Sequence, residues 1–160
     1  MAYIEFNTED FDPVAGFDCG QCFRWVPGED GTYCGVAGGK VGRVEYRDGI
    51  LRIHGAAEAD RQFWRRYFDL DRDYGKIKQQ LTGIDKFLDR AIEFGGGIRI
   101  LNQEFFETLI SFILSANNNI PRIRRCVERT AQYYGQTVDG HFTFPDVRAL
   151  SAATEADLNE

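Results

Sequence analysis

The densest group of side chains able to do chemistry lies in residues 114–125, between two apolar segments. Its polar members are three consecutive asparagines and a cluster of arginines, of which the candidates are Asn117, Asn118, Asn119, Arg122 and Arg125. Asn and Arg read base edges, and a helix N-terminus binds phosphate through its free N–H groups. Helix capping by Asn119, with Pro121 in the first turn, is the alternative explanation. Capping accounts for one or two asparagines, so contact with nucleic acid stays open for the others and for the arginines.

The charge distribution permits such a contact, although the net charge is −6. Residues 1–30 hold seven acids and one base, whereas the other 130 residues carry equal numbers of each. Within residues 117–129, four arginines stand against one glutamate. Nucleic-acid binding depends on local patches more than on total charge. The acidic N-terminus nevertheless predicts weak non-specific binding to DNA.

Cys19 and Cys22 form a Cys-x-x-Cys pair, which by itself is weak evidence for a metal or redox site. A structural zinc site needs four ligands, and the other Cys and His residues are scattered. A redox pair usually opens a helix, whereas this pair precedes an aromatic segment that reads as a strand. We therefore predict no metal and no cofactor. Four cysteines without a secretory signal, and no apolar run near the roughly 20 residues that span a membrane, favour a cytoplasmic protein with no membrane partner.

The elements that must position these residues are predicted to be strands in the first half and helices in the second. Apolar segments separated by Gly38-Gly39 and Asp48-Gly49, which favour tight turns, predict strands over 2–6, 22–26, 32–37, 40–46 and 50–54. Apolar spacing predicts helices over 58–70, 74–81, 85–94, 104–115 and 120–134. The Gly95-Gly96-Gly97 run is a candidate domain boundary.

The predicted helix 104–115 is apolar except for one narrow polar stripe, formed by Glu104, Glu107, Thr108, Ser111 and Ser115. Such a helix is expected to be buried on most sides. In the helix 120–134, the side chains expected to face inward are Ile123, Val127, Ala131 and Tyr134. Its arginines at 122, 125 and 129 share another face.

Four motifs in order resemble those of the 8-oxoguanine DNA glycosylases, a helix-hairpin-helix family. Residues 115–123 resemble its asparagine-rich junction, and Gly20-Gln-Cys-Phe-Arg-Trp25 is similar to its Gly-Gln-x-Phe-Arg-Trp motif; residues 67–70 and 97–103 also match. The resemblance runs from about residue 5 to the end. It implies an α+β fold, with an antiparallel TATA-binding-protein-like sheet domain and helices over 1–97. The first helices of a truncated helix-hairpin-helix domain would cover 98–160.

The function that the resemblance implies is base-excision repair of double-stranded DNA containing 8-oxoguanine opposite cytosine, by base flipping, glycosidic cleavage and lyase action. Asn117 and Arg122 then match the residues that contact the orphaned cytosine. Gly20 matches a glycine whose carbonyl accepts from N7–H of the lesion, a donor that guanine lacks. Phe112 matches an aromatic near the lesion pocket, with a core role as the alternative. The residues expected to orient the Gly20 loop are Gln21, Phe23, Arg24 and Trp25, with packing as the alternative for Phe23 and Trp25.

The catalytic part of the family pattern is not found in this sequence. The family uses a lysine and an aspartate from its helical hairpin region and the helix after it, and none of the four lysines here (Lys40, Lys76, Lys78 and Lys86) lies in such a context. Residues 154–157 resemble a capping box, which marks the start of a helix, and only three residues follow it in this sequence. We therefore expect the front part of a longer enzyme, inactive alone, located at the nucleoid or in the nucleus. A non-catalytic module that binds damaged DNA, and a fragment that binds nothing measurable, are the alternatives. The helix 105–114 is expected to expose apolar surface and to promote self-association.

Overall fold

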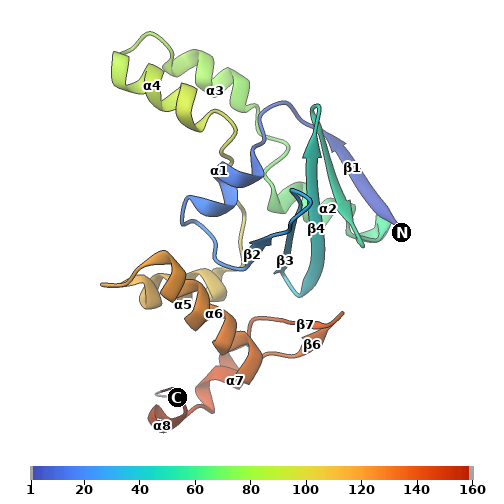
Figure 1. Ribbon diagram of the computed structural model, residues 1–160, viewed down its shortest axis with the longest axis vertical. Helices are drawn as coiled ribbons and strands as arrows, with labels where there is room; N and C mark the ends of the chain where they lie inside the picture. The colour runs from blue at the N-terminus through green and yellow to red at the C-terminus, as the bar shows by residue number, and fades with distance from the viewer. Residues whose placement is uncertain (1, 159–160) are drawn as a thin grey trace.

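A five-stranded antiparallel sheet forms the first part of the protein in a computed structural model that describes residues 2–158 (Figure 1). Its strands are β1 (Tyr3–Asn7), β2 (Trp25–Pro27), β3 (Tyr33–Ala37), β4 (Lys40–Arg47) and β5 (Ile50–His54), in the order β1-β5-β4-β3-β2. The β3–β4 and β4–β5 turns fall at Gly38-Gly39 and Asp48-Gly49, all with positive φ, as the sequence predicts. The predicted antiparallel α+β architecture is therefore confirmed.

Two short helices cover the core of this sheet. In α1 (Pro13–Asp18), Phe17 stacks on Trp25 with ring centroids 4.6 Å apart. A 3-10 turn, η1 (Glu58–Asp60), leads into α2 (Arg61–Tyr67), whose fully buried Trp64 lies over Gly42. A Cβ at residue 42 would lie 2.9 Å from that indole, so glycine is required there by the close approach of helix and sheet.

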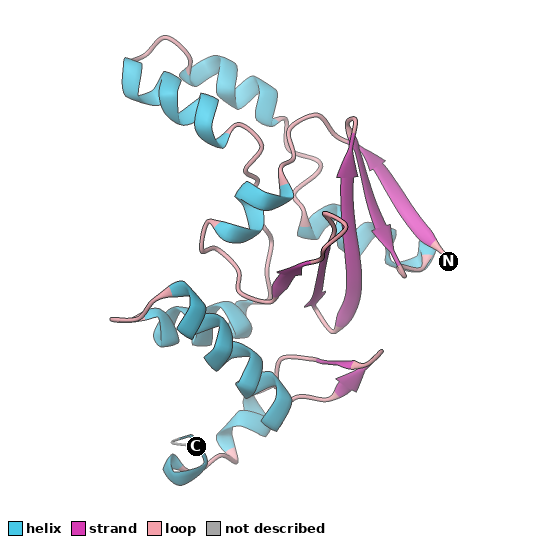
Figure 2. Ribbon diagram, viewed as in Figure 1, coloured by secondary structure: helices cyan, strands magenta, loops and turns pink. Residues whose placement is uncertain are grey.

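The remaining elements lie at opposite ends of the molecule (Figures 1 and 2). At one end, α3 (Tyr74–Leu81) and α4 (Lys86–Gly95) pair as a helical hairpin. At the other end, α5 (Phe105–Ser115) packs on α6 (Ile120–Tyr134). The chain then continues through a small hairpin, β6 (Thr137–Val138) and β7 (His141–Phe142), to α7 (Val147–Ser151) and α8 (Glu155–Leu158). Among residues 2–158, no helix is both long and apolar enough to cross a membrane.

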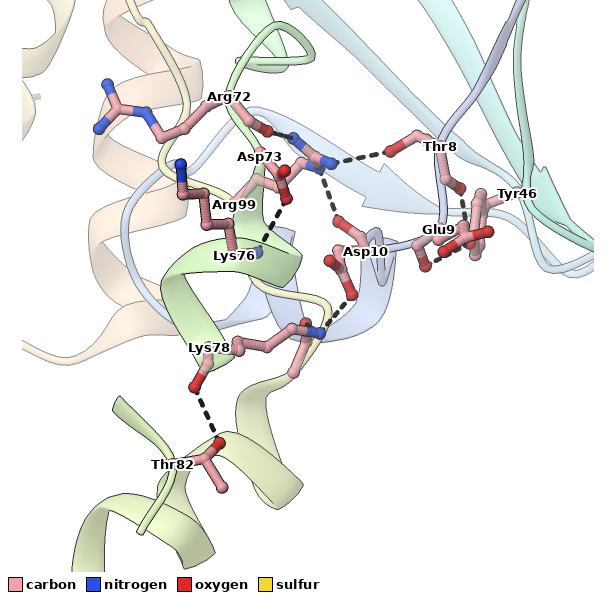
Figure 3. Close-up of polar contacts among 11 residues, drawn as sticks. Thr8, Glu9, Asp10, Tyr46, Arg72, Asp73, Lys76, Lys78, Thr82 and Arg99 are labelled. Carbon is pink, nitrogen blue, oxygen red and sulfur yellow. Dashed lines mark hydrogen bonds and ion pairs between the residues drawn. The ribbon is translucent and has the colours of Figure 1, made fainter. Parts of the chain in front are cut away.

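Arg99 joins the segment before α5 to the sheet part of the protein (Figure 3). Its guanidinium, in a residue only 5% exposed, donates to the carbonyls of Asp10 at 2.6 Å and Asp69 at 2.8 Å, and to Thr8 Oγ1 at 2.8 Å. The same group lies 4.5 Å from the centre of the Tyr74 ring. One buried side chain thus ties together three segments that are distant in the sequence.

Several element boundaries differ from the sequence-based prediction. The strand expected over 22–26 begins only at Trp25, because the preceding residues form a loop held by side-chain hydrogen bonds. The helix expected over 58–70 is divided into η1 and α2, and Asp69 with φ +51° follows its end. Three further features, α1, the β6–β7 hairpin and α7, are not among the elements predicted from the sequence. The helix predicted after residue 154 is present as α8, while its continuation through Asn159 and Glu160 lies outside the described residues.

The burial of α5 is the reverse of what its composition predicts. Ser111 is its one buried residue in the structure, whereas Phe105, Phe112 and Ile113 are 78%, 74% and 59% exposed. The expectation of a helix buried on most sides is therefore wrong for this chain. Within the polar stripe Ser111 is buried and Glu107 and Ser115 are half-buried, while Glu104 and Thr108 are exposed. The expected exposed apolar surface is confirmed. In α6, the inward face is confirmed at Ile123, Val127 and Ala131, and Tyr134 is half-buried.

Candidate functional site

Gly20 lies in the loop between α1 and β2, with its backbone in the left-handed region at φ +88°. A side chain would be strained in this conformation, whereas glycine adopts it freely. A Cβ built at this position would be 3.8 Å from Ile120 Cδ1 and within 4 Å of no other atom in the described residues. The Cβ position of Gly20 is therefore close to the start of α6, and the space around it is otherwise open apart from the neighbouring residues of the chain.

The loop around Gly20 is fixed by the side chain of Gln21. Its Nε2 donates to the carbonyls of Gly16 at 2.8 Å and Arg99 at 2.9 Å, and its Oε1 accepts from Leu101 N at 3.0 Å. Gln103 Nε2 in turn donates to the carbonyl of Gln21 at 2.6 Å. The side-chain amide of Gln21 thus donates to and accepts from backbone groups only. These bonds hold the loop in one position against residues 99–103.

Two other residues of the loop point into protein rather than toward solvent. Trp25 is 1% exposed, and its Nε1 donates to Tyr67 Oη at 2.9 Å, so it belongs to the core. The buried Arg24 side chain places Nε 3.5 Å from Glu128 Oε2, and its Nη2 donates to the carbonyl of Phe142. These two side chains anchor the loop to the protein interior and do not occupy the side of the loop that faces α5.

A cavity of about 170 Å³ lies in front of this loop, between the loop and α5. Its lining residues are Gly20, Gln21, Phe23, Gln103, Thr108, Ser111, Phe112 and Ser115. Four of these were predicted site residues, and the structure brings them together although they come from segments about 90 positions apart. Arg24 and Trp25 are not among the residues that line it.

Gln103 and the three hydroxyl residues of α5 that line the cavity are not among the site residues predicted from the sequence. Thr108 and Ser115 bond to carbonyls of their own helix. Ser111 is 6% exposed, and within residues 2–158 its hydroxyl makes no hydrogen bond. The polar stripe was the available signal, but a polar stripe on an apolar helix normally faces solvent.

The asparagine junction between α5 and α6 uses two of its three side chains locally. Asn119 caps α6 by accepting from Arg122 N at 3.1 Å. Asn118 Nδ2 donates to the carbonyl of Leu114 at 2.9 Å, and its Oδ1 accepts from Asn119 N at 2.9 Å. Asn117 has φ +52°, a conformation that asparagine tolerates better than most residues. The capping explanation therefore covers the side chains of Asn118 and Asn119.

The other predicted residues of this junction are free to meet a ligand. The side chains of Asn117, Arg122 and Arg125 are exposed and make no hydrogen bond or ion pair within the described part of the chain. Asn117 lies just before α6 and Arg122 in its first turn, where the helix dipole favours an anion, and Arg125 lies three residues further along the helix.

Two titratable groups near the site are shifted by burial. Burial raises the pKa of the Cys22 thiol to about 12, so it stays protonated and unreactive as a nucleophile at neutral pH. Burial also raises the pKa of Glu107 to about 7, opposed by the nearby Arg24. Among the residues described, no three His, Cys, Asp or Glu side chains gather as metal ligands do.

Comparison with known proteins gives consistent results. Residues 3–109 match the family described as 8-oxoguanine DNA glycosylase, N-terminal domain. An N-glycosylase/DNA lyase of Saccharomyces cerevisiae is 51% identical over 70 residues, which are 40% of this chain and 19% of the yeast protein.

Two solved structures are similar over nearly the whole chain. The apo form of Clostridium acetobutylicum 8-oxoguanine glycosylase/lyase is 41% identical with a TM-score of 0.91, covering 98% of this chain and 57% of the clostridial one. The same clostridial enzyme in complex with double-stranded DNA containing cytosine opposite 8-oxoguanine gives 39% identity and a TM-score of 0.90, covering 99% and 59%. The chain thus spans less than two thirds of the length of these relatives.

Proposed function

The chain belongs to the 8-oxoguanine DNA glycosylase family, and on that basis we propose that it carries the damage-reading and DNA-reading surface of a base-excision-repair glycosylase and AP lyase. Its partner is double-stranded DNA that contains 8-oxoguanine opposite cytosine. The observation that carries the proposal is the cavity lined by both Gly20 and Phe112, two residues that the family resemblance separately assigns to lesion recognition. We place the protein where that substrate is found, at a bacterial nucleoid or in a eukaryotic nucleus.

Gly20 is the proposed reader of the lesion. Oxidation converts N7 of guanine from an acceptor into a donor, so a carbonyl acceptor favours the damaged base and disfavours guanine. Phe112 supplies an exposed aromatic surface beside the same cavity. Gln21, Phe23, Arg24 and Trp25 position the loop, and the hydrogen bonds of Gln21 and Trp25 support this role.

Asn117, Arg122 and Arg125 are the proposed contacts to the opposite strand. An asparagine amide offers a donor and an acceptor, as does a cytosine edge, and the planar fork of arginine suits both a base and a phosphate. Asn118 and Asn119 are proposed to contribute to DNA binding by shaping the junction, and the Nδ2 group of Asn119 is not used in capping. Extrusion of a base costs a few kcal/mol, so the orphaned cytosine must be satisfied by the protein.

We assign no catalytic residue to this chain. None of its four lysines lines the cavity: Lys40 pairs with Asp60 at 2.7 Å, Lys78 pairs with Asp10, and Lys76 and Lys86 lie on the distant α3–α4 hairpin. A glycosylase that also cleaves the strand uses an amine as nucleophile. The chain by itself is therefore proposed to be inactive, and a non-catalytic module that binds damaged DNA is the second candidate.

The test uses the protein expressed from the complete reading frame that contains this chain. Single-turnover excision is measured on duplexes with 8-oxoguanine opposite cytosine or adenine. Asn117→Ala and Arg122→Ala are expected to lower the preference for cytosine by roughly tenfold, because each contact contributes about 1–3 kcal/mol of discrimination. The matched control is Arg47→Ala, whose side chain is 78% exposed on the sheet. Unchanged preference in both variants would refute the proposed roles, and damage-selective binding without excision would favour the non-catalytic module.

A further inference from the structure

Two ion pairs connect the Gly20 loop to helix α6. Asp18, two residues before Gly20, pairs with Arg124 through Oδ1 and Nη2 at 2.5 Å. Arg24, four residues after Gly20, pairs with Glu128 through Nε and Oε2 at 3.5 Å. Because residues 124 and 128 are one helical turn apart, both partners lie on the same face of α6.

The same face of α6 makes two more contacts with the loop. Arg124 Nη2 also donates to the carbonyl of Phe17 at 3.3 Å. One turn earlier, Ile120 Cδ1 lies 3.8 Å from the Cβ position of Gly20. Three successive turns of α6 thus contact the segment that contains Gly20. A shift of α6 is therefore expected to shift the Gly20 loop as well.

The opposite face and the N-terminus of α6 hold the residues proposed to contact the other DNA strand. Arg122 and Arg125 are exposed on the helix, and Asn117 lies just before it. The loop that reads the damaged base and the helix that reads its partner are therefore joined by the contacts of residues 18, 24, 124 and 128.

We propose that the pairs Asp18–Arg124 and Arg24–Glu128 are positioning contacts that couple recognition of the damaged base at Gly20 to recognition of the opposite base at Asn117 and Arg122. This inference rests on the proposed function. Asp18 and Arg124 bind each other, so their effect on DNA recognition is indirect. They fix the position of the Gly20 loop relative to α6. A change at residue 18, on the lesion side, then alters selectivity on the cytosine side.

The Asp18–Arg124 pair is the better of the two for a test, and thermal unfolding is measured beside selectivity because Asp18 Oδ2 also accepts from the buried Tyr33 Oη at 3.0 Å. The two side chains are 40% and 30% exposed, and ion pairs of this exposure contribute little to stability. The Arg24 side chain is 4% exposed, so its replacement would disturb buried packing. Variants with one charge reversed, compared with the variant in which both are reversed, separate the effect of the ion pair on loop position from an effect on the stability of the fold.

The experiment compares Asp18→Arg, Arg124→Asp and the double charge swap in the protein from the complete reading frame. The ratio of excision rates opposite cytosine and opposite adenine is measured, together with thermal unfolding. Each single variant is expected to lower the ratio by about two- to fivefold, the range set by a partly exposed pair. The swapped pair is expected to return the ratio to within about 1.5-fold of the wild type. A matched control is Asp71→Arg, which reverses one charge of the exposed Arg65–Asp71 pair beside α2 and leaves the ratio unchanged.

The outcomes separate the two proposals. A cytosine preference that stays at the wild-type value in both single variants, or that the double swap does not restore, overturns the coupling alone. A wild-type protein without preference for the lesion or for cytosine overturns the proposed function and the coupling with it.

Discussion

Arg99→Met removes every donor of the guanidinium that joins residues 97–103 to the sheet, while it keeps a side chain of similar length. Three of the hydrogen bonds are 2.8 Å or shorter, two of them to the main-chain carbonyls of Asp10 and Asp69 and one to the hydroxyl of Thr8. Figure 3 shows the bonds to Asp10 and Thr8. The substitution leaves these acceptors facing an apolar thioether in a place that is only 5% exposed. It also removes the stacking of the cation on Tyr74.

The expected cost follows from the number and kind of these bonds. A hydrogen bond to a charged group contributes about 1.5–3 kcal/mol net, but the desolvation of the buried cation offsets part of the sum. Breaking a buried ionic network typically costs about 3–5 kcal/mol, and we expect a loss in that range. For a chain of this size the loss corresponds to a decrease in melting temperature of about 10 °C.

Chemical unfolding followed by tryptophan fluorescence measures this loss, because Trp25 and Trp64 are 1% and 0% exposed and report on the core. Arg99→Lys keeps the charge but not the fork, so it is expected to lose about half as much. Arg47→Met, at an arginine that is 78% exposed, is the control for loss of a surface charge. A loss below about 1 kcal/mol in Arg99→Met would refute the view that Arg99 holds the segments together.

Three further predictions concern the site and its surroundings. Gly20→Ala places a Cβ on a residue with φ +88° and is expected to cost about 1 kcal/mol and to weaken the preference for 8-oxoguanine over guanine in competition binding by the complete protein; equal preference would contradict a carbonyl contact there. Burial raises the pKa of Glu107 from 4.5 in the unfolded chain to about 7, so the folded protein retains a proton that the unfolded chain has released, and stability falls as the pH rises through this interval. Glu107→Gln is expected to remove that decrease in unfolding measured between pH 4 and 8, and an unchanged pH dependence would show that the carboxyl is not buried. Phe105 is 78% exposed, and Phe105→Ser is expected to reduce concentration-dependent association in light scattering of this chain; a wild-type chain that is strictly monomeric at high concentration would count against the apolar surface as a contact.

Elements with a strong local signal were predictable from the sequence. The bounds of β5, α3 and α6 agree with the apolar spacing, and the predicted turns at Gly38-Gly39 and Asp48-Gly49 have positive φ values. The short α1 and the β6–β7 hairpin were missed, because elements of two to six residues contain too few apolar positions for periodicity to show. The boundary proposed at residue 97 remains a prediction, and Gly97 is packed against α1, where its carbonyl accepts from Asp12 N at 2.8 Å.

The site was predictable only in part, for a different physical reason. The family motifs located Gly20, Phe112 and Asn117, but they gave no information on what lies between them. Gln103 and Ser111 line the cavity together with Gln21, whose amide oxygen accepts from Leu101 N, 80 positions away. Local sequence patterns carry no information on contacts between residues so far apart in the sequence. They therefore could not show that part of the α5 polar stripe faces the protein interior.

The hydrogen bonds of Arg99 and Gln21 also bear on how the chain folds as it leaves the ribosome. All five strands of the sheet are complete at His54, yet the carbonyls of residues 10, 16 and 69 each accept from the side chain of Arg99 or from that of Gln21, which is itself held by residues 99–101. A nascent chain that stops before residue 99 thus lacks the link between its first helix, the end of α2 and the Gly20 loop. Protection of the sheet against proteolysis during synthesis is expected to rise sharply once this segment has emerged from the exit tunnel, well before α6 is complete.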